Sequence, residues 1–346
     1  MRQHHVGAII LAGLLTSCGG ADATDPMQPP GPTELTGEKF TATWGPVMVP
    51  AGQENTQCAV LTLDNEAPIK VHQMRNVLGS ASHHMIVYRD DASAEQPTPV
   101  NCKPFAGTLT PSAATSPIMI TQRSEEILTL PDGVAYTFAA HQKVRLEMHF
   151  LNATDQPQMI TGTSEFYAAK PEQIRDEADF LFIGSPDINL APRSTGVVDA
   201  FFTVPASLAG AKFFAITGHT HQYGTEMTVA TAASRTDAPA SVYAPVPFLW
   251  SEPETVKQDP PFEVPAGGGF NFHCGFRNTS NTTVKFGEST EDEMCFFWAY
   301  YYPSKGSRVC VHTIRASPPE GVDVCCPADP DDALSQLVCS YIATQL

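Results

Sequence analysis

Residues 287–303 read GESTEDEMCFFWAYYYP. The stretch opens with an acidic, turn-like run, places Met294 directly before Cys295, and continues into a dense aromatic segment that is typical of a buried strand. Methionine is usually an adaptable packing residue, so an isolated one carries little information. At the mouth of a strand its thioether can also bind a metal. The other candidate ligands of the chain decide between these two interpretations.

Upstream of this stretch, histidines form three short groups, with members His83, His84, His149, His219 and His221. Together with Met294 they supply two candidate metal sites, one with three imidazoles and one with two imidazoles and a thioether. Imidazole suits copper, zinc, iron and nickel, whereas a thioether mostly indicates copper, and Cu(I) in particular. The first three histidines alone also fit a zinc hydrolase, in which water completes the coordination.

The composition is that of a globular chain. Of its residues, 42% are hydrophobic and 16% are charged. The length of 346 residues indicates two domains with ample cores. The formal net charge is −17, and the 20 Lys and Arg residues are scattered along the chain. Because phosphate binding needs clustered cations, we exclude nucleic acid as a partner.

The N-terminus predicts export and anchoring. The apolar run Val6–Leu15 is too short for a membrane span and is typical of a signal peptide. The ending Leu-Thr-Ser-Cys resembles the lipobox of bacterial lipoproteins, which implies a signal over residues 1–18 and a lipid on Cys18; ordinary cleavage to a free protein is the alternative. Residues 19–37, rich in Gly, Pro, Thr and Asp, read as a flexible tether. The predicted location is the bacterial cell envelope, as an outer-membrane lipoprotein facing the periplasm or the exterior.

Cysteine arithmetic agrees with this assignment. The chain has nine cysteines, and an odd number would leave one thiol without a partner in an exported protein. Eight remain if Cys18 carries lipid. Eight thiols in an oxidising compartment can form four bridges. The sequence alone leaves about 105 pairings open.

The chain reads as an all-β protein. From residue 40 to 183, short apolar runs alternate with Pro, Gly, Asn and Asp, without a helical period. One strand is legible by alternation over 143–150, where His149 shares a face with Arg145 and Glu147 and points away from the apolar face. An aperiodic segment, 184–194, is the candidate junction between the domains.

The paired histidines differ in their local geometry. His219 and His221 are two residues apart, so they share one face at the end of an extended strand, which is a good chelate geometry. His83 and His84 are adjacent, so both can bind one metal only if the backbone there twists or bulges.

These motifs resemble the copper type II, ascorbate-dependent monooxygenases, the family that includes peptidylglycine α-hydroxylating monooxygenase and dopamine β-monooxygenase. The segments that carry the resemblance occur in the family's order and span about residues 40–303: His83-His84-Met85, Leu146-Glu147-Met148-His149-Phe150, His219-Thr220-His221 and Glu291-Asp292-Glu293-Met294-Cys295.

The resemblance implies a fold and two metal sites. The fold is two tandem jelly-roll-like antiparallel β-sandwich domains, over residues 38–185 and 186–303, with a copper on each facing a solvent-filled cleft. The electron-storing copper would be held by His83, His84 and His149. The copper that binds O₂ and oxidises substrate would be held by the catalytic ligands His219, His221 and Met294.

The resemblance also implies the disulfides Cys58–Cys102 and Cys274–Cys295, the latter fastening the residue beside Met294. Residues 304–346 form a Cys-rich C-terminal extension. The family's partner position near residues 202–206 has no cysteine here, so we expect the extension's cysteines to pair among themselves: Cys310, Cys325, Cys326 and Cys339.

One departure from the family concerns the substrate. Where the peptide-hydroxylating enzyme grips a carboxylate with an Arg, an Asn and a Tyr, this chain has Thr217, Phe296 and Trp298. These residues cannot replace a bidentate Arg clamp. The predicted substrate is therefore small and neutral or aromatic, rather than a glycine-extended peptide.

The predicted function is hydroxylation of a C–H bond with O₂ and an external one-electron reductant such as ascorbate, with two copper ions per chain. A non-catalytic copper-binding or storage lipoprotein is the alternative. A zinc hydrolase is a third hypothesis.

Overall fold

β-Strands supply nearly all of the regular structure in the computed structural model, which describes residues 33–105, 108, 115–315, 317–327, 336–337 and 339–340. The predicted signal peptide, Cys18 and most of the predicted tether lie outside the described residues. Within the described part of the chain, no helix has the length and apolar character needed to cross a membrane.

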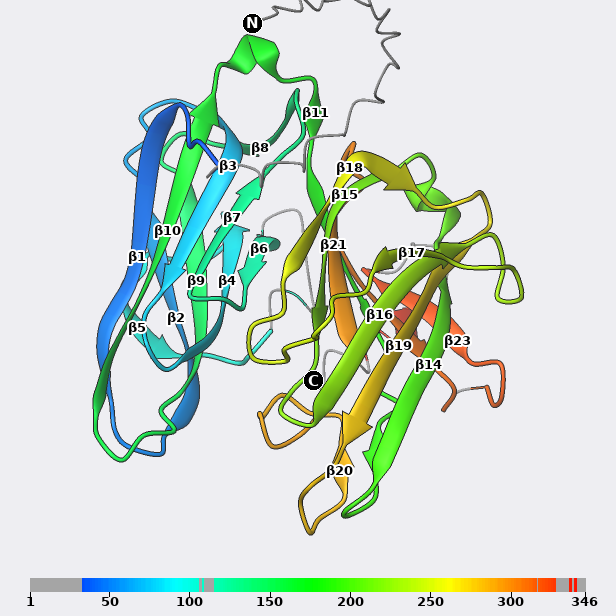
Figure 1. Cartoon of the computed structure of the whole chain (residues 1–346). Helices are drawn as coiled ribbons and strands as arrows, with labels where there is room; N and C mark the ends of the chain where they lie inside the picture. Colours follow the sequence, from blue (N-terminus) through cyan, green and yellow to red (C-terminus); the bar gives the residue numbers. More distant parts are fainter. Residues whose placement is uncertain are drawn as a thin grey trace, which may run out of the picture. The chain divides into compact units, whose positions relative to one another are not determined.

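The first sandwich is built from β1 (Glu38–Val49), β2 (Glu54–Thr62), β3 (Ile69–Leu78), β4 (Ser82–Asp90), β5 (Gln96–Asn101), β6 (Thr115–Thr121), β7 (Glu125–Thr129), β8 (Val134–Phe138), β9 (Lys143–Leu151), β10 (Gln158–Ala169) and β11 (Asp176–Glu177). One sheet has the order β5-β2-β9-β4-β6, and the other has the order β1-β10-β3-β8-β11 with β7 paired to β3 (Figure 1). Apolar side chains of the two sheets, including Trp44, Leu146 and Phe150, are buried between them.

The second sandwich is built from β12 (Asp179–Gly184), β13 (Asn189–Leu190), β14 (Thr195–Thr203), β15 (Lys212–His219), β16 (Gly224–Ala232), β17 (Ala240–Tyr243), β18 (Thr255–Glu263), β19 (Gly269–Arg277), β20 (Val284–Lys285), β21 (Phe296–Tyr302), β22 (Arg308–Thr313) and β23 (Val322–Cys326). The main sheets have the orders β18-β15-β21-β12-β22-β23 and β14-β19-β16-β17, and β13 pairs with β20. Short 3₁₀ turns, η1 (Pro171–Gln173) and η2 (Ala206–Leu208), lie between strands. The predicted all-β class with antiparallel β-sandwiches is confirmed.

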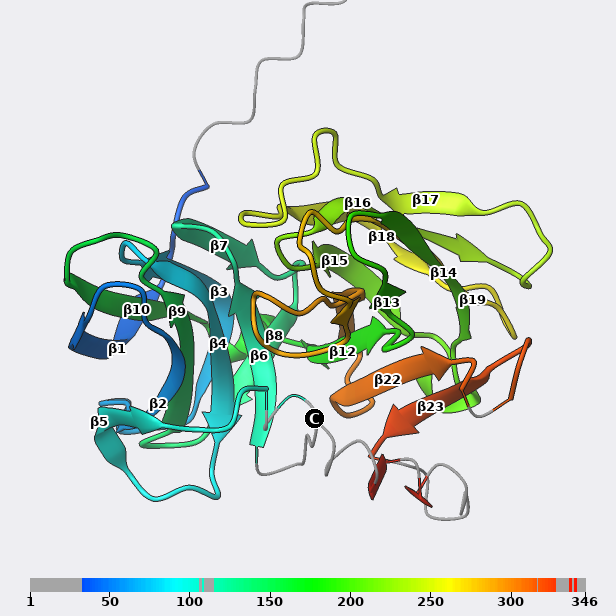
Figure 2. The ribbon, with the colours of Figure 1, turned by 90° about the horizontal axis from the view of Figure 1, so that it is seen from below.

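The Cys-rich extension contributes two strands to the second sandwich. β22 runs parallel to β12, and β23 pairs with β22 at the edge of that sheet (Figure 2). The predicted pairing of the extension's cysteines with one another is confirmed by Cys310–Cys325 and Cys326–Cys339. The disulfides Cys58–Cys102 and Cys274–Cys295 are also present.

An aromatic layer joins the two sandwiches. Along β21, Phe296, Trp298 and Tyr300 belong to the core cluster of the first sandwich, whereas the alternate residues belong to that of the second. The backbone N–H of Ile120 in β6 donates to the Tyr300 hydroxyl at 3.1 Å. Separating the sandwiches would expose these rings at roughly 1.5–3 kcal/mol each, so apolar burial holds the two together.

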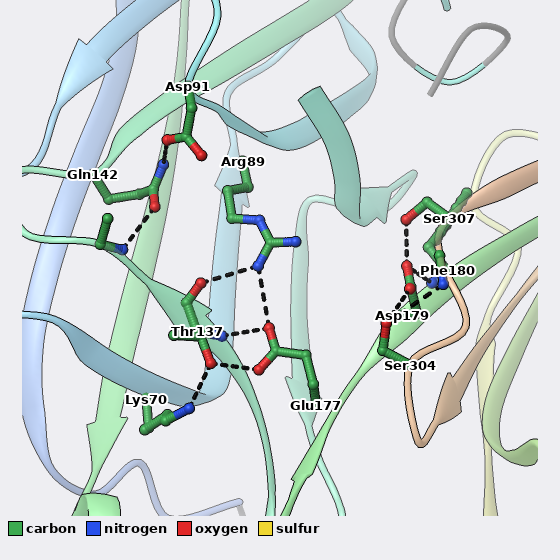
Figure 3. A network of polar contacts seen from close by, with 12 residues as sticks. Lys70, Arg89, Asp91, Thr137, Gln142, Glu177, Asp179, Phe180, Ser304 and Ser307 are labelled. Carbon is green, nitrogen blue, oxygen red and sulfur yellow. Dashed lines mark hydrogen bonds and ion pairs between the residues drawn. The ribbon is translucent and has the colours of Figure 1, made fainter. Parts of the chain in front are cut away.

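The chain crosses between the sandwiches where β11 ends and β12 begins, N-terminal to the aperiodic segment 184–194. Two carboxylates, two residues apart, fix this connection to different sandwiches (Figure 3). The domain boundaries at 185 and 303 stay predictions. The Glu177 carboxylate accepts hydrogen bonds from Thr137 N (2.7 Å) and Arg89 Nη1 (3.1 Å). The Asp179 carboxylate accepts hydrogen bonds from Ser304 Oγ (2.6 Å) and Ser307 Oγ.

The two sandwiches share one arrangement of strands, turns and pairing register, which we call the frame. After the equivalent strands β9 and β19, a buried Asn side chain closes the turn by donating three hydrogen bonds of 2.8–3.1 Å to backbone carbonyls: Asn152 to Val49, Pro50 and Gln156, and Asn278 to Leu190, Ala191 and Thr282. The strands next to β9 and β19 are paired in the same register. Leu151, the residue before Asn152, pairs with Glu54, and Arg277, the residue before Asn278, pairs with Thr195.

A bulge is repeated as well. The register shifts between Ser82 and His84 in β4, and between Gly224 and Glu226 in β16. Directly after the bulge, His84 pairs with His149, and Glu226 pairs with Gly275. The second sandwich therefore has Glu226 and Gly275 at the frame positions of these two histidines.

Candidate metal centre

The first histidine set lies on one face of the β4–β9 pair. The predicted bulge at His83 and His84 is confirmed, and it turns both rings towards His149. Ring centroids are 5.2 Å apart for His83–His84, 5.2 Å for His83–His149 and 5.0 Å for His84–His149. One nitrogen from each ring lies within 4.8 Å of the others, so the three can converge on one metal ion.

A carboxylate orients His149. Its Nε2 contacts Glu54 Oε1 at 2.9 Å. Burial tends to raise the pKa of Glu54, but hydrogen bonds from His149 and Thr290 lower that pKa to about 2, so the carboxylate is ionised and accepts. The His149 Nε2 is therefore the protonated nitrogen, and Nδ1 is left as the ligand atom.

The second histidine pair lies at the end of β15. The His219 and His221 rings are 5.0 Å apart and perpendicular, at 89°. His219 Nδ1 lies 2.5 Å from Gln122 Oε1, and His221 Nδ1 lies 3.2 Å from the Asp292 carbonyl oxygen. The carbonyl can only accept, so His221 Nδ1 is the donor and its Nε2 is free to bind a metal.

Glu293 fastens Met294 to this pair. Its buried carboxylate accepts hydrogen bonds from the backbone N–H of His221 at 2.9 Å and of Met294 at 3.2 Å. Met294 itself is 4% exposed and directly precedes the disulfide-bonded Cys295. The strand end and the segment before β21 thus bring Met294 close to the His-Thr-His motif.

The two histidine sets are in contact, which corrects the expectation of a solvent-filled cleft. Ring centroids are 6.0 Å apart for His83–His221 and for His84–His219. The exposure of the five rings ranges from 0% at His221 to 8% at His83. Burial of the aromatic layer between the sandwiches closes the space in which the resemblance placed solvent.

Burial also sets the protonation of the imidazoles. It lowers the pKa of His83, His84 and His219 well below the usual range, and that of His221 to about 4. Neutral imidazole is the form that binds metal. Nitrogens without a hydrogen-bond partner in the described structure are His83 Nε2, both of His84, His219 Nε2 and His221 Nε2.

Such buried, unpartnered nitrogens are costly unless a ligand occupies them. A copper ion fits this donor set, because it accepts imidazole nitrogen and, as Cu(I), thioether sulfur. The first set supplies three nitrogens. The second supplies two nitrogens, and Glu293 ties the backbone of Met294, the candidate thioether ligand, to that of His221. The assignment of two copper ions stays a prediction.

The predicted substrate residues are buried and adjoin the histidines. The Trp298 ring lies 5.9 Å from that of His219, and Phe296 stacks on Phe182 at 4.8 Å. The Thr217 hydroxyl lies 2.7 Å from that of Thr255. Their role in a substrate pocket stays a prediction.

Sequence reasoning missed four residues at this centre. Glu54 and Gln122 hold histidine rings, Phe105 lies 5.0 Å from His84, and Trp250 lies 5.9 Å from His83. Glu54 and Gln122 are 95 and 97 residues from the histidines that they contact, so no local spacing pointed to them. Phe105 carries one signal only after folding: its φ is 53°, and its N–H donates to buried Glu147 at 2.6 Å.

Comparison with known proteins supports a C-terminal part of the chain. Residues 200–319 match the family model described as copper type II ascorbate-dependent monooxygenase, C-terminal domain. No curated protein matches the chain. Among solved structures, one of broad bean stain virus is 9% identical, covers 78% of this chain and 91% of its own, and has a TM-score of 0.24.

A second, of infectious bursal disease virus Gt strain, is 11% identical, covers 82% of this chain and 78% of its own, and has a TM-score of 0.17. At these TM-scores, neither likeness carries an argument. The family match contains the second histidine pair and Met294. Over residues 200–319 this chain therefore resembles the C-terminal domain of the copper type II ascorbate-dependent monooxygenases, as the motifs predicted.

Proposed function

We propose that this protein is a copper-dependent monooxygenase that hydroxylates a C–H bond of a small, neutral or aromatic substrate. One oxygen atom of O₂ enters the C–H bond as a hydroxyl group, and the other leaves as water. Two protons and two electrons are required, and an external one-electron reductant such as ascorbate supplies the electrons in two steps. Copper, when bound, would supply the one-electron chemistry and the activation of O₂.

The observation that carries this proposal is the second site. His219 and His221 are held through Nδ1 and direct unpartnered Nε2 atoms inward, and Glu293 ties Met294 to them. A thioether beside two imidazoles is suited to Cu(I), and two strong ligands with one weak ligand leave room for O₂. This site lies within the segment that matches the family.

The chain's own residues have distinct parts in this proposal. His83, His84 and His149 would hold the electron-storing copper, with Glu54 fixing the His149 ring. The contact between the two sets, at ring distances of 6.0–6.2 Å, gives an electron a short path between them.

The walls of the reaction site determine the substrate class. Trp298 presents aromatic surface beside His219, Phe296 pairs with His219 between β21 and β15, and Thr217 carries no positive charge. Apolar area would supply the binding, whereas an unpaired carboxylate would be costly to desolvate at this place.

One observation favours the alternative of a non-catalytic copper-holding protein. The five histidines are at most 8% exposed, and the aromatic layer closes on them. Such a closed centre suits retention of copper. Turnover would require the sandwiches to separate, or the site to open beside His83, the most exposed of the five histidines.

Metal analysis and oxygen consumption test the proposal together. After copper loading, we expect about two copper ions per chain and O₂ uptake that depends on ascorbate. Phenethylamine-like compounds and a glycine-extended peptide, offered side by side, test the substrate class. Hydroxylation of the peptide alone would refute the role given to Thr217, Phe296 and Trp298. Two copper ions without turnover of either compound would favour the storage alternative, and one zinc without copper uptake would refute both.

The location is a separate proposal. We place the protein in the bacterial cell envelope, anchored by a lipid on Cys18, because the sequence around that residue resembles a lipobox. Cys18→Ser is expected to move the protein from the membrane fraction to the soluble fraction. An unchanged distribution would contradict the lipid anchor.

A further inference from the structure

Gln122 connects the two sandwiches at a metal ligand. It follows β6 of the first sandwich and is 3% exposed. Its Nε2 donates to the Gly218 carbonyl oxygen at 3.1 Å, and its Oε1 lies 2.5 Å from His219 Nδ1. Both partners belong to β15 of the second sandwich. The amide side chain of a first-sandwich residue therefore holds a candidate metal ligand of the second sandwich.

The chemistry of this contact fixes the state of His219. The Gly218 carbonyl can only accept, so the amide directs its NH₂ group there and its oxygen towards the imidazole. An amide oxygen also only accepts, and His219 Nδ1 must therefore carry the proton. Its Nε2, buried and without a hydrogen-bond partner among the described residues, is then the unprotonated nitrogen.

We propose that Gln122 is a positioning residue that makes the second metal site dependent on contact between the sandwiches. In contact, it holds His219 with Nε2 as the ligand atom; apart, His219 loses this partner, and both tautomers become available. Metal binding at His219 and His221 and docking of the sandwiches thus favour one another, and the coupling is reciprocal. This inference rests on the proposed function, because it assigns Gln122 to the proposed second copper site.

The neighbouring contacts show why Gln122 is distinct. Ile120 N–H donates to the Tyr300 hydroxyl across the same interface, and Glu126 accepts from the Thr255 hydroxyl, and neither of these two bonds includes a histidine. A merely structural bond at Gln122 would act on docking as these do. A positioning bond also acts on the tautomer of His219 and on one metal site only.

The experiment uses the full chain with Gln122→Met, which keeps the length of the side chain and removes both hydrogen bonds. Tyr300→Phe is the matched control, because it removes a cross-sandwich bond without touching a histidine. Long-range ¹H–¹⁵N NMR of the metal-free protein, with His219 assigned by comparison with His219→Asn, reports the tautomer. Competition for Cu(I) with a chromophoric chelator reports the affinity of each site.

We expect Gln122→Met to lose the Nδ1–H tautomer of His219 as the single form, and to weaken Cu(I) binding at the second site by about 10–100-fold while the first site is unchanged. Tyr300→Phe is expected to keep the tautomer. Gln122→Glu, which retains an acceptor towards His219, should keep the Nδ1–H tautomer as well, and it serves as the test if the Met variant does not fold.

A wild-type tautomer with Nε2 protonated would overturn the inference, as would an unchanged tautomer and affinity in Gln122→Met. In both cases the monooxygenase proposal stands if wild-type protein binds two copper ions and consumes O₂. Conversely, a shifted tautomer with weakened second-site Cu(I) binding supports the inference even if no substrate is turned over.

Discussion

The β4–β9 pair of the first sandwich and the β16–β19 pair of the second share a register and a bulge, yet they carry different side chains. In the first, His84 pairs with His149, and both belong to the proposed metal set. In the second, Glu226 pairs with Gly275, and the candidate ligands lie elsewhere, at the end of β15 and before β21. The frame is repeated, but the metal-binding position is not.

This difference separates two ways of building a metal site. The first set stands on two paired strands of one sheet, so its own sandwich holds the rings in place. The second set lies where a strand ends, and one of its rings is held by Gln122 of the other sandwich. We therefore expect the first site to be preformed and the second to depend on docking.

The largest effect is expected from substitutions at matched frame positions. His84→Ala removes a ligand from the first site and is expected to lower the copper content from about two to about one per chain and to abolish ascorbate-driven O₂ uptake. Glu226→Ala, at the equivalent position, should leave both values unchanged. Elemental analysis of the two variants checks this, and a loss of copper in Glu226→Ala would end the comparison.

A second substitution sharpens the assignment of the thioether. Met294→Ala is expected to keep the fold and to lower O₂ uptake by at least about 10-fold, since it removes a tuning ligand from the second site. X-ray absorption of the Cu(I) protein should lose its sulfur contribution. Met227→Leu is the control, because the backbone N–H of His219 donates to the Met227 sulfur at 3.2 Å. Sulfur that disappears with Met227 and persists without Met294 would reverse the assignment.

The repeated asparagine turns test whether the frames are energetically alike. Asn152→Ala and Asn278→Ala each delete three donated hydrogen bonds and leave carbonyls buried, so each should cost about 2–4 kcal/mol of unfolding free energy. Urea denaturation of both variants measures the costs. Values that differ by more than about 2 kcal/mol would show that the turns match in geometry but not in stability.

The smallest effect concerns the contact between the sandwiches. Burial raises the pKa of Glu126 to about 7, although the hydrogen bond that Thr255 donates to it acts in the opposite direction. The folded state thus keeps a proton that the unfolded chain releases near pH 4.5, so this contribution to stability is full below that pH and is lost as pH rises through about 7.

Glu126→Gln cannot ionise, and we expect it to be more stable than wild type by about 1–3 kcal/mol at pH 8 and equal to it near pH 4.5. Thermal unfolding at both values checks the sign. Glu125→Gln is the control, because Glu125 is exposed and paired with Arg75 at the surface. A gain that is the same at both pH values would contradict the raised pKa.

Local periodicity was enough for some of this structure. The alternation around His149 placed its ring off the core face, and the adjacency of His83 and His84 required the bulge that β4 has. The all-β class followed from short apolar runs between turn residues. These features depend only on neighbours in the sequence, which is why they were predictable.

The arrangement between the sandwiches was not predictable in this way. Gln122 acquires its partner His219 only when two separately patterned domains dock, and Glu54 meets His149 only when β2 pairs with β9, so no period in the chain encodes either contact. The expected cleft was wrong for the same reason. Phe296 and Trp298 are predicted pocket walls, and that role stays a prediction; their packing in the core cluster of the first sandwich could be seen only in the folded chain.

The contact between Trp250 and His83 has a consequence for how metal is delivered. Among the five histidines, His83 is the most exposed, at 8%, and the Trp250 ring lies 5.9 Å from it. Of the five imidazoles, that of His83 is therefore the one that we expect an arriving ion to contact first.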